Sequence, residues 1–119
     1  MVLDTNVLIL FSKGDKRVVD TLLRVSEPLL ISRITYMEFL ADIRLTEEES
    51  KQAKQFLTGQ FSIIDVGEEV ADAGIAIRKQ SSFKLPDALI IATARVWKQK
   101  LFTLDARMRK MFPEITISR

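Results

Sequence analysis

The chain contains neither cysteine nor histidine, and these two absences narrow the chemistry open to it. Without cysteine it has no disulfide, no zinc–thiolate site, no iron–sulfur cluster and no thiol nucleophile. Without histidine it has no Ser-His-Asp triad and no histidine-ligated zinc, copper or iron. An enzyme made of these residues must use carboxylates, hydroxyls, lysine, arginine, or a metal with oxygen ligands, which favours Mg²⁺, Mn²⁺ or Ca²⁺.

Long apolar runs, low-complexity linkers and internal repeats are missing too. No stretch reaches the roughly 18 apolar residues of a membrane span, so we expect no contact with a membrane. The first apolar run has no basic segment before it and is interrupted by Asp4, unlike a secretory signal, so we expect a cytoplasmic protein. The 119 residues suit one domain, predicted to span residues 1–119.

Short apolar runs alternate with helical patterns along the chain, which predicts an α/β fold with a mostly parallel sheet. The predicted strands are Val2–Leu3, Leu29–Ser32, Ser62–Val66, Leu101–Leu104 and Ile115–Ile117. The predicted helices start near Asn6, Asp15, Thr46, Gly67 and Pro86. Thr46 and Glu49 have the spacing of a capping box, and Pro86 suits the first position of a helix.

Four acidic residues stand in mainly apolar surroundings: Asp4, Glu38, Asp87 and Asp105. Asp4 interrupts the first apolar run, and Asp105 follows a predicted strand. Asp87 opens an apolar helix, and helical spacing places Glu38 on one face with Ile34, Ala41 and Leu45. Each also has a structural interpretation: Asp4 and Asp105 as helix caps, Asp87 as a complement to a helix dipole, and Glu38 as an ion-pair partner of Arg33 or Arg44.

Together, the four acids favour a metal site. In open α/β sheets, ligands bind at the carboxyl ends of the strands, where some of these acids are expected. Carboxylates gathered there would repel one another unless cations were present. Two divalent ions about 4 Å apart are a known arrangement for hydrolysing phosphodiesters, and that chemistry needs no histidine. The 18 basic against 16 acidic residues, with seven basic residues and two acids from Arg95 to Arg119, agree with a polyanionic substrate.

Four segments resemble the acidic motifs of PIN-domain ribonucleases, and their order and spacing are similar to those of single-domain VapC toxins. The segments are LDTNVLI at 3–9, TYMEFL at 35–40, LPDALIIATA at 85–94 and LFTLD at 101–105. The resemblance implies a single PIN-like domain with a parallel sheet of about four to five strands flanked by helices. It also implies Mg²⁺ or Mn²⁺ held by Asp4, Glu38, Asp87 and Asp105, with Asn6 and Thr103 in orienting roles.

The same resemblance implies function and partners. It implies endonucleolytic cleavage of RNA by metal-activated water, a homodimer, and a cognate antitoxin whose tail fills the active-site groove. Apolar residues for a dimer, around Leu22, Leu40 or Phe56, are not separable by pattern from core residues. After Asp105 the chain reads Ala106-Arg107-Met108-Arg109, where many relatives have a further acidic or polar residue, so Asp105 is expected to be the weaker ligand.

Two alternatives remain open. A non-catalytic PIN-like domain would bind RNA or a partner without cutting, although a binding module has no need of four carboxylates that repel one another. A Mg²⁺-dependent phosphotransfer domain also places an aspartate after its first strand. The phosphatase version wants a second aspartate where this chain has Asn6, and the receiver version wants a lysine where it has Asp105.

Overall fold

The computed structural model describes residues 1–117, and its centre is a five-stranded sheet in which every paired strand is parallel. The strands are β1 (Val2–Leu3), β2 (Leu30–Ser32), β3 (Ser62–Ile64), β4 (Leu101–Phe102) and β5 (Thr116–Ile117), in the spatial order β3-β2-β1-β4-β5. Val2 pairs with Leu30 on one side and with Leu101 on the other, so β1 is central. The predicted α/β fold with a small parallel sheet is confirmed.

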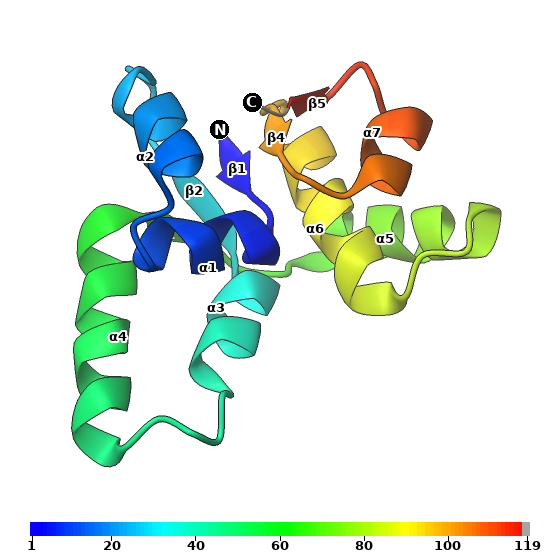
Figure 1. The fold of residues 1–119 in the computed structure, drawn as a ribbon. Helices are drawn as coiled ribbons and strands as arrows, with labels where there is room; N and C mark the ends of the chain where they lie inside the picture. The colour runs from blue at the N-terminus through cyan, green and yellow to red at the C-terminus, as the bar shows by residue number, and fades with distance from the viewer. Residues whose placement is uncertain (118–119) are drawn as a thin grey trace.

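Within the described residues, seven helices lie between successive strands, and Figure 1 shows how they surround the sheet. They are α1 (Thr5–Ser12), α2 (Lys16–Leu23), α3 (Arg33–Leu40), α4 (Glu47–Gln60), α5 (Glu68–Gln80), α6 (Leu85–Val96) and α7 (Ala106–Met111). The predicted capping box of Thr46 and Glu49 begins α4. Helix α6 begins at Leu85, one residue before the predicted start at Pro86.

Two apolar clusters cover the two faces of the sheet. One cluster joins Val2 and Leu101 to buried residues of α5, α6 and α7, and the other joins Leu3 and Ile31 to buried residues of α1, α2 and α4. Leu22 belongs to the second cluster and is only 5% exposed, so the suggestion that it supports a dimer surface is wrong. Neighbouring residues of a strand point to opposite faces, which explains why Val2 and Leu3 enter different clusters.

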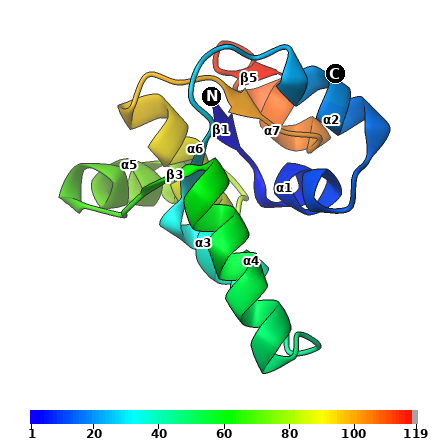
Figure 2. The ribbon, with the colours of Figure 1, turned by 90° about the vertical axis from the view of Figure 1, so that its left-hand side faces the viewer.

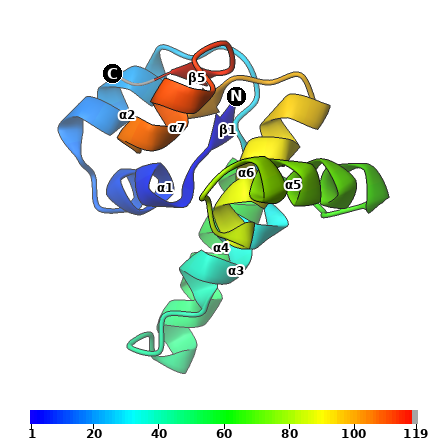
Figure 3. The ribbon, with the colours of Figure 1, turned by 90° about the vertical axis from the view of Figure 1, so that its right-hand side faces the viewer.

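Helices α3 and α4 project together away from the sheet, as the two side views make plain (Figures 2 and 3). An open hollow of about 750 Å³ between them is lined by Tyr36, Leu40 and residues of the first two turns of α4. Ser118 and Arg119, the last of the counted basic residues, lie outside the described part of the chain. No helix within residues 1–117 has the length and apolar character needed to cross a membrane.

Candidate active site

The four predicted acids come from four different segments that meet at the carboxyl edge of the sheet. Asp4 directly follows β1, and Asp105 lies three residues after the end of the neighbouring strand β4. Glu38 is on α3, the helix that follows β2 without a loop, and Asp87 is in the first turn of α6. Because β1, β2 and β4 are adjacent and parallel, their carboxyl ends bring these segments to one place.

Asp4 is a buried carboxylate held by hydrogen bonds on both oxygens. Asp4 as a whole residue is only 4% exposed. The backbone N–H of Thr5 donates to Oδ1 at 2.8 Å, and the buried hydroxyl of Thr103 donates to Oδ2 at 2.8 Å. Asp4 thus caps α1, as its helix-capping interpretation predicted. The cap leaves the negative charge in place, and an ionised carboxylate in such a position needs compensation.

Thr103 connects Asp4 to Asp105. While its hydroxyl donates to Asp4, it accepts the backbone N–H of Asp105 at 3.0 Å. Asp105 in turn caps α7, because its Oδ1 accepts the backbone N–H groups of Arg107 at 2.8 Å and Met108 at 3.1 Å. The predicted cap is therefore present, and both of these bonds are made to Oδ1.

Glu38 is joined to the Asp4 segment by a threonine. The hydroxyl of Thr5 donates to Glu38 Oε1 at 2.7 Å and lies 3.0 Å from the hydroxyl of Thr35. Since Thr5 gives its proton to Glu38, Thr35 must be the donor to Thr5. This places a short chain of hydroxyls, from buried Thr35 to Thr5, behind the Glu38 carboxylate.

Two expectations about Glu38 are wrong. Its predicted ion-pair partners are engaged elsewhere, Arg33 with Asp65 at 2.6 Å and Arg44 with Asp42 at 2.8 Å. The expected apolar face shared with Ile34, Ala41 and Leu45 is also absent: α3 ends at Leu40, so Leu45 is not on this helix, and Glu38 and Ala41 are exposed.

The electrostatics of Asp4 and Asp87 show that the acids act on one another. Burial raises the pKa of Asp4, the hydrogen bonds from Thr103 and Thr5 oppose that rise, and the charges of Asp87 and Asp105 add to it. Burial also raises the pKa of half-buried Asp87, and the charges of Glu38 and Asp105 raise it further. Arg107 and Lys84 act in the opposite direction on Asp87. All four acids are therefore close enough for mutual repulsion.

The donor atoms suit a hard divalent cation. Within residues 1–117, no group of three or more Asp or Glu side chains is placed to hold a metal ion. The chemistry of the gathered groups nevertheless fits Mg²⁺ or Mn²⁺, because they offer only carboxylate oxygens, and burial together with mutual repulsion raises the pKa values of Asp4 and Asp87. A cation among them would offset that repulsion.

The two predicted orienting residues differ in their surroundings. Thr103 is fully buried and bonded to Asp4, whereas Asn6 is exposed on the first turn of α1. The sequence interpretation did not single out Thr35 or Arg107. Thr35 is three residues before Glu38, one helical turn away, and that spacing was the available signal.

The basic residues near the C-terminus do not form one surface beside the acids. Arg95 and Lys100 both contact Glu114, at the end of α6 and the beginning of β4, opposite the edge where Asp87 and Asp105 lie. Among the six of these basic residues that lie within residues 1–117, Arg107 acts on the pKa of Asp87, which it lowers. The expectation of a basic third of the chain beside the site is therefore only partly met.

Comparisons with known proteins agree with this arrangement. The profile of the PIN domain family matches residues 1–112. No curated protein is similar enough in sequence to match the chain. Among solved structures, a toxin–antitoxin complex from Klebsiella pneumoniae includes a chain with 29% identity and a TM-score of 0.79, covering 98% of this chain and 94% of that one.

Two more distant structures share the fold. VapBC2 from Rickettsia felis, bound to a DNA fragment from its promoter, has a chain with 18% identity and a TM-score of 0.82, covering 99% of this chain and 97% of that one. VapBC-1 from nontypeable Haemophilus influenzae has a chain with 21% identity and a TM-score of 0.79, and the match covers 99% of this chain and 95% of that one. The similarity extends over almost the whole length of all three, so no large insertion separates the chains.

Proposed function

The chain belongs to the PIN domain family, and from that premise we propose that it is a Mg²⁺- or Mn²⁺-dependent endoribonuclease, the toxin of a toxin–antitoxin pair. The observation that carries the proposal is the meeting of Asp4, Glu38, Asp87 and Asp105 at one sheet edge, linked by threonine hydroxyls and by mutual repulsion. The family resemblance drawn from the four motifs is confirmed; the catalytic role of these acids is part of the proposal.

In this proposal the four acids hold the metal, and the hydroxyls hold the acids. When bound, the metal supplies activated water and charge stabilisation at the phosphate. Thr103 fixes one oxygen of Asp4 and the backbone of Asp105 at once, so these two ligands keep a constant separation. Thr5 orients Glu38 through one oxygen, leaving Oε2 for a ligand. Asn6, one residue beyond Thr5, is exposed and available to orient substrate.

The proposed partners follow from the same family. The similar structure from Klebsiella pneumoniae is a toxin–antitoxin complex, which supports an antitoxin protein as the partner of this chain. RNA is the proposed substrate and the cytosol the proposed location. A homodimer is also proposed, and sedimentation of the purified chain measures it directly.

The test of the proposed function is RNA cleavage with matched variants. Purified protein is mixed with a structured RNA pool and Mg²⁺ or Mn²⁺, beside an EDTA control. We expect cleavage that EDTA abolishes and that Asp87→Asn lowers by more than ~100-fold, since even outer residues of metal sites change activity 10- to 100-fold. Asp72→Asn, an exposed acid on α5, is the matched control and should cut normally.

The alternatives give different results in this assay. RNA binding without cleavage under either metal, unaffected by EDTA, would replace the proposal by the non-catalytic PIN-like domain. Rapid labelling by acetyl phosphate would replace it by the phosphotransfer domain. Cleavage that survives Asp87→Asn would remove Asp87 from the metal site while keeping the nuclease.

A further inference from the structure

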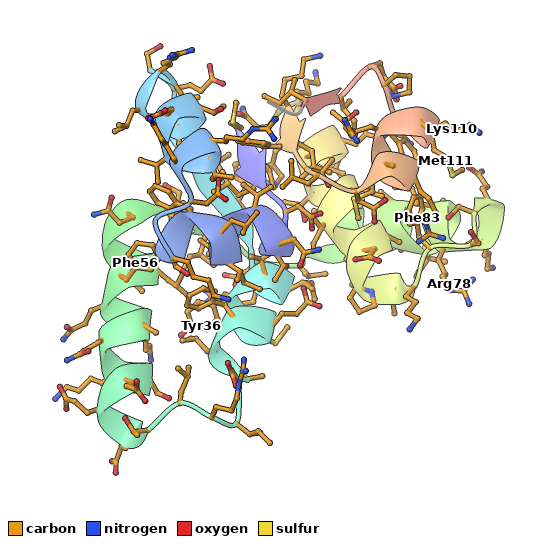
Figure 4. All side chains as sticks on the ribbon, viewed as in Figure 1. Tyr36, Phe56, Arg78, Phe83, Lys110 and Met111 are labelled. Atoms are coloured by element: carbon orange, nitrogen blue, oxygen red, sulfur yellow. The ribbon has the colours of Figure 1, made fainter. Side chains whose placement is uncertain are left out.

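Arg107 is held in place by two neutral groups at the border of the acid cluster. Its Nη1 donates to Ser82 Oγ at 3.2 Å, and its guanidinium lies 4.6 Å from the centre of the Phe83 ring. Phe83, labelled in Figure 4, is buried and packs against Phe112 at the end of α7, with 6.2 Å between the ring centroids, so it gives the guanidinium a fixed platform. The stacked guanidinium therefore spans from α7 to the segment that leads into α6.

The backbone of Arg107 is fixed by one of the acids themselves. Its N–H donates to Asp105 Oδ1 at 2.8 Å, so the capping carboxylate sets the position of the first turn of α7. On the opposite side, Ser82 and Phe83 precede Asp87 by only a few residues. Arg107 thus contacts one proposed ligand through its backbone, and its charge acts on a second, where it opposes the rise in the pKa of Asp87.

Among the described residues Arg107 forms no ion pair with a carboxylate, a property it shares with Arg17, Arg24 and Arg78. Arg33, Arg44 and Arg95 form ion pairs with Asp65, Asp42 and Glu114. A guanidinium has five N–H donors in a planar fork that matches phosphate oxygens. Arg107 is exposed, and its contact with Ser82 uses one nitrogen, so further donors remain for a ligand.

We propose that Arg107 binds a backbone phosphate of the RNA next to the cleaved bond, with Ser82 and Phe83 holding its guanidinium in position. The proposal rests on the proposed ribonuclease function and names a substrate contact of that site. A cluster of acids repels a polyanion, so a cation fixed at its border favours the approach of a phosphate to the metal. A purely structural role would tie α7 to the α5–α6 segment and would leave RNA binding unchanged.

The test compares four proteins, each carrying Asp87→Asn to suppress cleavage. They are the parent, Arg107→Gln, Ser82→Ala and the control Lys110→Gln, which removes an equal charge from the outer side of α7 (Figure 4). Binding of a fluorescent single-stranded RNA of mixed sequence is measured at several salt concentrations with Mg²⁺ present. Thermal melts of all four proteins accompany the binding curves.

We expect Arg107→Gln to weaken RNA binding about tenfold, the typical effect of one charge-assisted hydrogen bond. The slope of log K against log salt should fall by about 0.7, one phosphate contact on a single strand. Ser82→Ala keeps the charge and removes the bond that orients it, so it should weaken binding less and leave the slope unchanged. Lys110→Gln should alter both quantities by less than half as much as Arg107→Gln.

The failures of the two proposals are distinguishable. If the chain with intact acids cleaves RNA but Arg107→Gln binds with unchanged affinity and slope, the phosphate contact is overturned while the nuclease stands; an Arg107 that instead contacts a partner protein gives this result. An equal effect from Lys110→Gln also overturns the proposal, because RNA binding would then depend on the net charge of α7 and not on the position of Arg107. If Arg107→Gln does not fold, Ser82→Ala decides: unchanged affinity overturns the proposal. Absence of any RNA cleavage by the unmodified chain overturns the proposed function itself.

Discussion

At the scale of single residues, Asp4 carries the clearest electrostatic penalty. Burial and two neighbouring acids raise its pKa above the ordinary value of 3.8 in the folded chain. The folded state then binds a proton more tightly than the unfolded state, so between 3.8 and the raised pKa the free energy of unfolding falls as the pH rises. Above the folded pKa the full penalty is present.

We therefore predict that Asp4→Asn stabilises the metal-free protein at neutral pH. The amide oxygen can still accept the N–H of Thr5, and the amide N–H₂ can donate to Thr103. The difference from the unmodified chain should vanish on acidification below 3.8, where both are uncharged at this position. Thermal melts in EDTA across this pH range measure the effect.

Asp42→Asn is the matched control because the pKa of Asp42 is shifted in the opposite direction to that of Asp4. The pairing with Arg44 lowers the pKa of Asp42 to about 2, so its small contribution is present above 3.8 and is lost as the pH falls toward that lower value. Removing this carboxylate should leave stability slightly lower or unchanged at neutral pH. If Asp4→Asn behaves like Asp42→Asn in EDTA, the penalty attributed to Asp4 is wrong.

The site residues also show what a sequence can predict at this scale. The caps of Asp4 and Asp105 depend on neighbours one to three residues away, and both were predicted. The contacts of Glu38 depend on Thr5, 33 residues away in the chain, and were not predicted. No local pattern encodes that meeting, because it arises from the pairing of β1 with β2.

At the scale of elements, the packing of α5 against α6 depends on a single glycine. A Cβ added to Gly74 of α5 would lie 2.5 Å from Leu89 Cδ2 and 3.2 Å from Leu89 Cγ of α6. Gly59 of α4, by contrast, has nothing within 4 Å of such an atom. The two glycines share a helical backbone and differ in their neighbours, which makes them a matched pair.

We predict opposite effects for Gly59→Ala and Gly74→Ala. Alanine favours the helix by up to about 1 kcal/mol at either position, less near the end of α4. At Gly74 the displacement of Leu89 costs roughly 1–3 kcal/mol and outweighs that gain. Denaturant unfolding should separate the two variants by about 1–2 kcal/mol, with Gly74→Ala the less stable. A Gly74→Ala variant as stable as Gly59→Ala would show that α6 yields without cost.

The elements themselves were largely predictable, and the exception is instructive. Alternating apolar runs and caps gave the five strands and most helices, because those signals are local. Helical spacing predicted that the apolar face of α3 continues to Leu45. The helix instead ends at Leu40, and a loop connects it to the start of α4 at Glu47. Apolar residues of α3 and α4 face each other instead, and the ring centroids of Phe39 and Phe56 are 6.4 Å apart.

At the scale of the whole molecule, folding and the metal site are coupled through the sheet. The same strands that carry the two apolar clusters end at the acids, so the fold forces like charges together wherever the core forms. That arrangement lowers the stability of the metal-free protein, and any cation that binds the folded state alone must raise it. The coupling is measurable without RNA and without activity.

We predict that Mn²⁺ raises the melting temperature of the unmodified chain, by an amount that grows with the logarithm of the Mn²⁺ concentration once it exceeds the Kd. At about ten times its Kd, linkage gives ~1.4 kcal/mol, which corresponds to a rise of roughly 5 °C or more for a domain of this size. Asp87→Asn should melt at or above the unmodified chain in EDTA and gain less from Mn²⁺, whereas the variant of exposed Asp72, Asp72→Asn, should follow the unmodified chain. Equal shifts in all three proteins would mean that Mn²⁺ binds elsewhere, and the four carboxylates would then have to be explained as a substrate-repelling or partner-binding surface.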